Sequence, residues 1–211
     1  HTHLPVVAIE AFVNAGQMYE TESTAGVAAL AGRLLDEGTI HRSALEIAEN
    51  IECMGGTLHT RSRGASVQVL ADYLPEALNI MADVLRHPKF EPQEIEKERR
   101  RTLAMLESDE DTLSVAGYYL FNEMVYGKHP YHRPPKGYTH TVSALSRDDI
   151  LEYYTTYFVP NNTILAIVGD VSGTEVFEYV QQYFGEWPSR QLPPYPVCEI
   201  PAPEGPVRQS V

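Results

Sequence analysis

The order of helix-like and strand-like segments is the feature that most restricts the fold of this chain. Strand-like runs occupy residues 4–14, two short stretches within 57–70, and residues 162–171, and helical periodicities fill most of the intervening sequence. The segments do not alternate regularly, as they do in parallel sheets built from βαβ units. The pattern therefore predicts an α+β fold.

Three local patterns predict where individual elements lie. The run NTILAIVGDV at 162–171 is almost uninterrupted and apolar, which is typical of a strand at the centre of a sheet covered on at least one face by helices. Ser23 is expected to cap the first helix, which Gly38 would end. A long amphipathic helix is expected from Pro92 to the acidic run at 107–111. Its predicted inward residues are Ile95, Thr102, Leu103 and Leu106, and its predicted outward residues are Glu96, Lys97, Glu98, Arg100 and Arg101.

Composition and length restrict the domain organisation. A chain of 211 residues with 43% hydrophobic content can bury a substantial core as one domain. We expect residues 1–187 to form a single α+β lobe. Seven of the fifteen prolines fall between Pro188 and Pro206, so residues 188–211 are expected to form an extended linker or strap.

Charge and cysteine usage exclude several classes of function. The net charge of −13 argues against a nucleic-acid-binding protein, which would need a basic face, and favours basic or neutral peptides as ligands. The basic clusters at 61–63 and 97–101 are interpreted as solvated surface. No apolar run reaches the roughly 18 residues of a transmembrane helix. Cys53 and Cys198 are too far apart in sequence to suggest a zinc knuckle or a disulfide scaffold.

Six segments, taken in order, resemble one lobe of the pitrilysin, insulinase and mitochondrial processing peptidase family. They are LPVVAIEAFVNAGQMYET, GVAALAGRLLDEGT, IECMGGTLH, LPEALNIMADVLRHPKFEPQEIEKERR, HPYHRPPKGY and YFVPNNTILAIVGDV. The resemblance covers nearly the whole chain. It implies a mixed, mainly antiparallel sheet covered by helices, as in processing peptidases, and a second lobe beyond the strap.

Active members of this family carry an inverted zinc motif, H-x-x-E-H, and a distal Glu ligand some seventy to eighty residues later. Histidines four residues apart on a helix can bind one zinc ion, and the Glu between them activates its water. The resemblance places these four functions on Ala29, Gly32, Arg33 and Met105, although Glu107 or Glu110 could lie near the distal position. Ala and Gly have no donor atom, a guanidinium repels zinc, and a thioether binds it poorly. The resemblance therefore implies that this lobe has no catalytic residue and no zinc ligand.

The family resemblance also implies a role for such a lobe. Family members pair their lobes around a chamber that holds an extended peptide. In this chain Leu58, His59, Thr60 and Arg61 occupy the segment that active relatives use as a substrate-binding edge strand, where those relatives often carry Asn-Ala. We expect a non-catalytic subunit or lobe that pairs with a zinc-bearing homologue, in which the zinc would reside. The alternatives are an assembly subunit with no proteolytic role and a peptidase whose zinc site lies in a lobe absent from this chain.

Other candidate sites have simpler interpretations. His129 and His132, with His140 beyond them, could form a metal cluster, but a loop rich in Pro and Tyr fixes no ligand geometry. The acidic run at 107–111 lacks the pattern of a calcium-binding loop and is interpreted as a solvated helix end. Asp170 follows an apolar strand and is expected to serve in a turn or cap.

Overall fold

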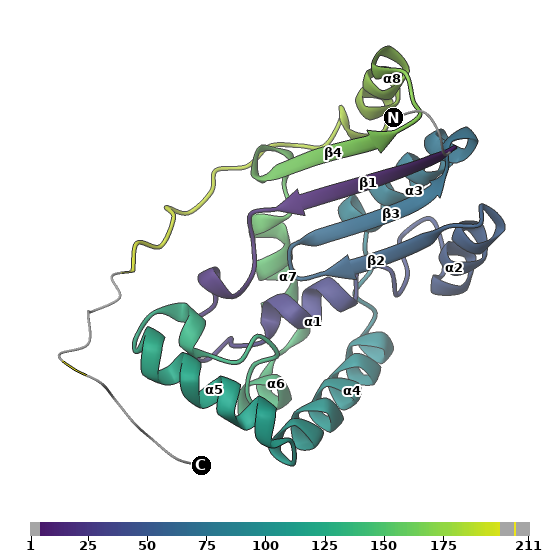
Figure 1. Cartoon of the computed structure of the whole chain (residues 1–211). Helices are drawn as coiled ribbons and strands as arrows, with labels where there is room; N and C mark the ends of the chain where they lie inside the picture. Colours follow the sequence, from purple (N-terminus) through teal and green to yellow (C-terminus); the bar gives the residue numbers. More distant parts are fainter. Residues whose placement is uncertain (1–4, 199–204, 206–211) are drawn as a thin grey trace.

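A computed structural model describes residues 5–198 and residue 205 and contains a four-stranded sheet (Figure 1). The strands are β1 (Val6–Val13), β2 (Thr57–Arg61), β3 (Gly64–Leu70) and β4 (Thr163–Gly169), in the spatial order β2-β3-β1-β4. Each described neighbour pair is antiparallel. The predicted α+β class and antiparallel sheet are confirmed.

Strand β1 lies inside the sheet and pairs on both sides. Val7 lies opposite Val69 of β3 and Gly169 of β4. Alternate residues of β1, namely Val7, Ile9, Ala11 and Val13, are buried, and the residues between them are more exposed. This alternation is typical of a sheet with one face on the core.

The prediction that residues 162–171 form the central strand is wrong. They contain β4, which is an edge strand that pairs only with β1 among the described strands. Ile164 and Val168 are 67% and 72% exposed, while Leu165 and Ile167 pack partly against the core. A continuous apolar run does not distinguish a strand buried on both faces from an edge strand with a bare apolar face.

Eight described α-helices accompany the sheet. They are α1 (Val27–Arg33), α2 (Ala44–Cys53), α3 (Leu74–Arg86), α4 (Pro92–Glu110), α5 (Leu113–Tyr126), α6 (Thr139–Ala144), α7 (Arg147–Tyr157) and α8 (Gly173–Phe184). Helices α3 and α7 lie behind the sheet in Figure 1, and α1 lies below β2 with α4, α5 and α6 beyond it. Helix α1 thus lies between the β2 edge and the α4–α6 cluster.

Helix α1 begins and ends at residues other than those predicted. It starts after Gly26, which has a φ of 95°, and the expected cap Ser23 lies outside the helix. The first turn is instead capped from a distance, because the buried carboxylate of Glu20 accepts a hydrogen bond of 2.9 Å from the Ala28 amide. The helix ends at Arg33 rather than continuing to Gly38. Its position is therefore set by tertiary contacts that local periodicity does not reveal.

Residues 188–198 contain no helix or strand. Arg190 is held by the side chain of Asn161, which donates to its carbonyl at 2.9 Å and accepts from its amide at 3.2 Å. Tyr195 meets Tyr19 edge to face, with ring centroids 6.0 Å apart. Residues 199–204 and 206–211 of the predicted strap lie outside the described residues, and the boundary at 187 stays a prediction.

None of the helices in the described part of the chain is both long enough and apolar enough to cross a membrane.

Candidate functional site

A pocket of about 220 Å³ lies where α1, β2 and α4 meet. Its lining residues are Arg33, Asp36, Glu37, Leu58, His59, Thr60, Glu98 and Arg101. The set contains a position from the predicted zinc motif and three residues of the predicted edge strand. The structure therefore brings these two groups of residues to one place.

Two of the four predicted zinc-site positions are in direct contact. The Nη2 atom of Arg33 lies 3.7 Å from the sulfur of Met105, across 72 residues of sequence. Ala29 lies one turn before Arg33 on α1 and is half-buried. Glu107 and Glu110, the other positions considered for the distal ligand, are exposed on the last turns of α4. Contact with Arg33 favours Met105 as the distal position.

Glu98 is buried, and the prediction that it faces solvent is wrong. Its side chain is 1% exposed and lies 3.8 Å from Arg33 and 3.3 Å from Arg101. One oxygen, Oε2, has no hydrogen-bond partner within the described residues. The sequence predicted that Glu98 faces solvent, because its partner Arg33 on α1 lies 65 residues earlier in the chain. The contact between these two side chains was therefore not predicted.

Gly32 lies directly against the turn between β2 and β3. A Cβ atom at this position would lie well under 3.0 Å from backbone atoms of Arg61 and Ser62, a separation that real Cβ atoms essentially never show. Backbone atoms cannot move aside as a flexible side chain can. The turn therefore fills the space that any larger side chain at position 32 would need.

The β2 strand presents an unpaired edge beside the pocket. It pairs with β3 alone among the described strands. Leu58 and Thr60 are half-buried, whereas His59 and Arg61 are exposed. The Thr60 hydroxyl donates to Asp36 at 2.8 Å, and burial raises the pKa of Asp36 above its usual value. The inward side chains anchor β2, and no described strand pairs with its outer backbone edge.

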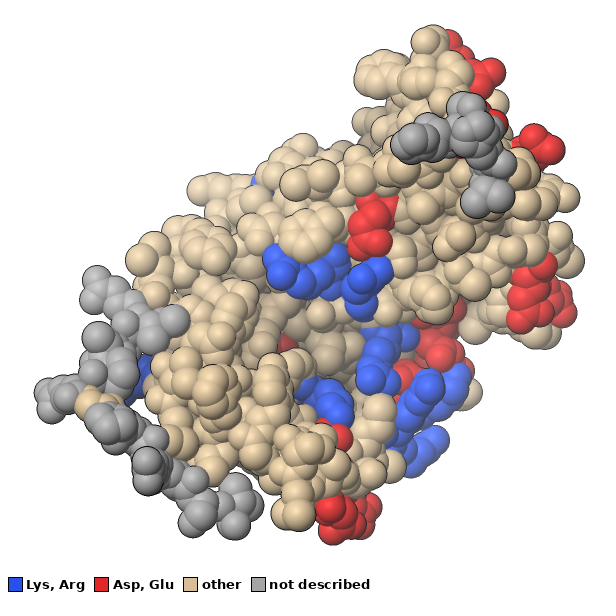
Figure 2. Space-filling view, in the orientation of Figure 1, with Lys and Arg blue, Asp and Glu red and all other residues tan. Residues whose placement is uncertain are grey.

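Exposed charge around the pocket is mainly basic. Figure 2 shows Lys and Arg side chains gathered along the hollow between the sheet and α4. Arg61 is 51% exposed and pairs with Glu10 at 3.2 Å, and Arg101 is 66% exposed and pairs with the buried Glu98 at 3.3 Å. The most exposed charged side chains beside this edge are thus cations, although carboxylates pair with them.

Two family models match the sequence. One, described as insulinase (peptidase family M16), matches residues 2–130, and another, described as peptidase M16 inactive domain, matches residues 144–210. The first alone covers more than half of the chain. This protein belongs to the M16 family, which includes pitrilysin and insulinase.

Curated relatives of this M16 chain include proteins named as peptidases and one named as a cytochrome b-c1 complex subunit. The chain is 29% identical to mitochondrial-processing peptidase subunit beta of Bos taurus, over 98% of this chain and 44% of the relative. It is 24% identical to an uncharacterized zinc protease of Bacillus subtilis, over 87% of this chain and 46% of that relative. It is 25% identical to cytochrome b-c1 complex subunit 1 of Bos taurus, over 85% and 38%. The chain spans less than half the length of these relatives.

Solved structures share the fold of this M16 lobe. A protease from Helicobacter pylori superposes with a TM-score of 0.86 at 21% identity, over 94% of this chain and 49% of that one. A peptidase M16 inactive domain from Pseudomonas fluorescens superposes with a TM-score of 0.83 at 21% identity, over 96% of this chain and 50% of that one. The first half of the periplasmic protease PqqL from Escherichia coli superposes with a TM-score of 0.82 at 18% identity, over 94% of this chain and 45% of that one.

The residues at the four predicted motif positions of this M16 chain do not fit a zinc ion. Ala29 and Gly32 offer no donor atom, and the thioether of Met105 is a poor zinc ligand. The permanently charged guanidinium of Arg33 lies against Met105 and Glu98, where an ion would have to bind. No hydrolytic step can be assigned to these four side chains.

The other candidate residues have local roles in the M16 lobe. His129 accepts a hydrogen bond from the Tyr131 amide at 3.2 Å, and His132 lies 2.8 Å from the carbonyl of His129. His140 stacks on Tyr138, so the three histidines do not converge. Asp109 of the acidic run pairs with Lys136. Asp170 is exposed beyond the end of β4.

Replacing Arg33 with Met is expected to lower the free energy of unfolding by roughly 2 kcal/mol, because Glu98 would lose one of its two cations. The expected cost is below that of a fully buried pair because Arg33 is 32% exposed and its ion pair is long. Urea unfolding measures the change. Adding Glu98→Gln to Arg33→Met should recover most of the loss, and a purely additive double variant would contradict the coupling.

Proposed function

We propose that this chain is a non-catalytic lobe of an M16 peptidase and that it pairs with a zinc-bearing homologous lobe or subunit around an extended peptide. The observation that carries the proposal is the contact between Arg33 and Met105, which fills the motif positions with a cation and a thioether. Zinc would then be supplied by the partner.

The β2 edge is the proposed contact for the peptide. An extended peptide adds to an open strand edge through main-chain hydrogen bonds, so the absence of the Asn-Ala pair of active relatives does not prevent binding. Arg61 and Arg101 are exposed cations beside this edge, where they pair with Glu10 and Glu98. We therefore favour a peptide with acidic side chains at this point, in place of the basic or neutral peptide expected from the net charge.

An assembly role is the second candidate. The curated relative named cytochrome b-c1 complex subunit 1 matches 85% of this chain, at an identity close to that of the zinc protease. In this alternative the lobe associates with its partner, and peptide cleavage does not depend on it. In a third alternative, the zinc site lies in another lobe of the same protein.

The test uses the full-length protein that contains this chain together with zinc-bearing M16 homologues from the same organism. Cleavage of a fluorogenic peptide is measured for each protein alone and for the mixture. We expect the mixture to cleave at least tenfold faster than the partner alone. Stable co-elution with an unchanged rate would support the assembly role. Cleavage by the full-length protein alone would support the third alternative, and either outcome would contradict the proposal.

A pair of charge variants tests the peptide contact. Arg61→Glu should lower kcat/KM for an acidic peptide by about tenfold, which corresponds to about 1.4 kcal/mol of lost attraction at the β2 edge. Lys128→Glu changes the net charge equally at an exposed position between α5 and the following turn, and it should have little effect. Equal losses for the two variants would show that only overall charge matters.

A further inference from the structure

Two histidines and an aspartate converge at the end of α3, away from the α1–α4 pocket. Asp83 lies in the last turn of α3, and His87 follows four residues later, so their side chains share one side of the helix end. His41 comes from the loop between α1 and α2. The backbone holds this loop against α3, because the Ile40 amide donates to the His87 carbonyl at 3.0 Å and Thr39 bridges to Pro88. The three residues are therefore brought together by fixed backbone positions.

One oxygen of Asp83 accepts two hydrogen bonds, and the other accepts none within the described residues. Oδ2 accepts hydrogen bonds from the Thr39 hydroxyl at 2.7 Å and from the Arg42 guanidinium at 2.6 Å. Oδ1 is buried and has no hydrogen-bond partner within the described residues, although the side chain is only 3% exposed. The Nδ1 atom of His87 is likewise buried without a hydrogen-bond partner there. Buried polar atoms without partners are rare, because each costs the free energy of its lost hydration.

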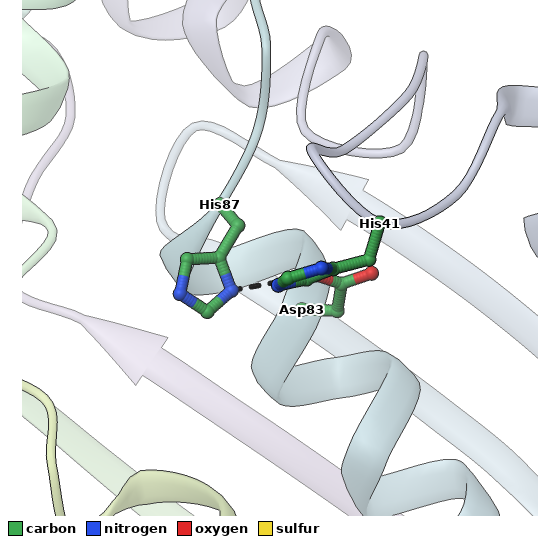
Figure 3. Close-up of side chains that lie close together, drawn as sticks. All are labelled: His41, Asp83 and His87. Atoms are coloured by element: carbon green, nitrogen blue, oxygen red, sulfur yellow. Dashed lines mark ion pairs between the residues drawn. The ribbon is translucent and has the colours of Figure 1, made fainter.

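These two atoms, which make no hydrogen bond within the described residues, face one another and a nitrogen of His41. Oδ1 of Asp83 lies 3.3 Å from Nδ1 of His87 and 3.9 Å from Nε2 of His41, and all three atoms lie within 4.8 Å of one another. Figure 3 shows both imidazole rings beside the carboxylate, with a dashed line marking one of the ion pairs. The arrangement offers two nitrogen donors and one oxygen donor to a single point.

We propose that His41, Asp83 and His87 bind one divalent transition-metal ion of the zinc class. Ligand bonds of about 2.0–2.2 Å at tetrahedral angles separate donor atoms by roughly 3.3 Å. The Asp83–His87 separation already has this value, and the His41 ring, 57% exposed, can rotate to close the longer one. Two imidazoles and a carboxylate suit zinc, cobalt or nickel rather than calcium or magnesium, which prefer oxygen ligands.

The surroundings of the site resemble the supporting shell of a metal centre. Thr39 and Arg42 hold the second oxygen of Asp83 and so orient the first one, as hydrogen bonds to ligand carboxylates do in metal sites. The positive charge of Arg42 lowers the affinity relative to a site with uncharged neighbours. Three protein ligands leave the fourth position open to water. A bound ion would join the α1–α2 loop to the end of α3 and so stabilise the folded state.

Titration of the full 211-residue chain with ZnCl2, followed by calorimetry, and the visible absorption of added Co²⁺ test the proposal. We expect one ion per chain, a raised Tm, and the absorption of a four-coordinate cobalt site. His41→Ala and His87→Ala should each weaken binding at least tenfold. The exposed position of His41 makes its variant a suitable test even if His87→Ala folds poorly.

Three matched variants separate this site from other histidines. His59→Ala removes an imidazole beside the α1–α4 pocket, His132→Ala one beside α5, and His3→Ala one that precedes the described residues. Each should bind zinc as the unaltered chain does. Absence of saturable binding, or binding that survives both His41→Ala and His87→Ala, would overturn the proposal.

Discussion

Replacing Gly32 with Glu, the residue that the family resemblance predicts for this position in an active zinc motif, is expected to lower the free energy of unfolding by on the order of 4 kcal/mol. Overpacking a tight site costs about 1–3 kcal/mol, and the carboxylate would also lose hydration beside backbone atoms of Arg61 and Ser62. Such a loss is a large part of the stability of an ordinary domain. Urea denaturation measures it.

Two alanine variants isolate the steric cause. Gly32→Ala should destabilise the chain by about 2 kcal/mol, because the clash outweighs the roughly 1 kcal/mol that alanine gains over glycine in a helix. Gly117 lies in α5, and a Cβ atom there would meet nothing within 4 Å, so Gly117→Ala should stabilise the chain by about 0.5–1 kcal/mol. Equal effects at the two positions would show that the β2–β3 turn does not constrain position 32.

Glu20 is expected to make the protein less stable as the pH rises from about 4.5 to about 7. Burial raises the pKa of this carboxyl from 4.5 to about 7, although the hydrogen bond from Ala28 opposes the shift. The folded state therefore holds a proton that the unfolded state releases within this window. Glu20 therefore stabilises the folded state at low pH, and about 3 kcal/mol of this stabilisation is lost by pH 7.

Glu20→Gln should remove this dependence. The amide oxygen of Gln can still accept from Ala28 without carrying a charge, so the variant should gain stability over the original chain as the pH rises. Urea unfolding at pH 5, 6, 7 and 8 gives the difference at each pH. Glu49→Gln, at an exposed position of α2, is the control and should show no such trend. A difference for Glu20→Gln that stays constant with pH would contradict the assignment.

Sequence periodicity predicted which segments form helices and strands better than it predicted what surrounds each of them. The start of the long helix at Pro92 is a local signal, and α4 begins there. The position of β4 could not be predicted, because an apolar run reports composition rather than the number of neighbouring strands. The start of α1 depends on Glu20, whose carboxylate reaches the helix only in the folded chain.

The candidate site was predicted in part. The family resemblance assigned Arg33 and Met105 to one predicted zinc site, and the structure brings the two side chains into contact. Glu98 was misassigned because its charge suggested solvent, and its partner Arg33 comes from another helix. The cluster of His41, Asp83 and His87 left no local signal, since the spacing between the histidines depends on how the α1–α2 loop crosses the end of α3.

The place of β1 in the sheet has a consequence for biosynthesis. Its pairing with β3 needs the chain only as far as residue 70, but its other side pairs with residues 163–169. While the ribosome adds the intervening residues, the side of β1 that will pair with β4 has no partner strand, so its backbone N–H and C=O groups make no hydrogen bonds within the sheet. An exposed strand edge of this kind can join another nascent chain, so slow translation would lengthen the interval in which misassembly competes with folding.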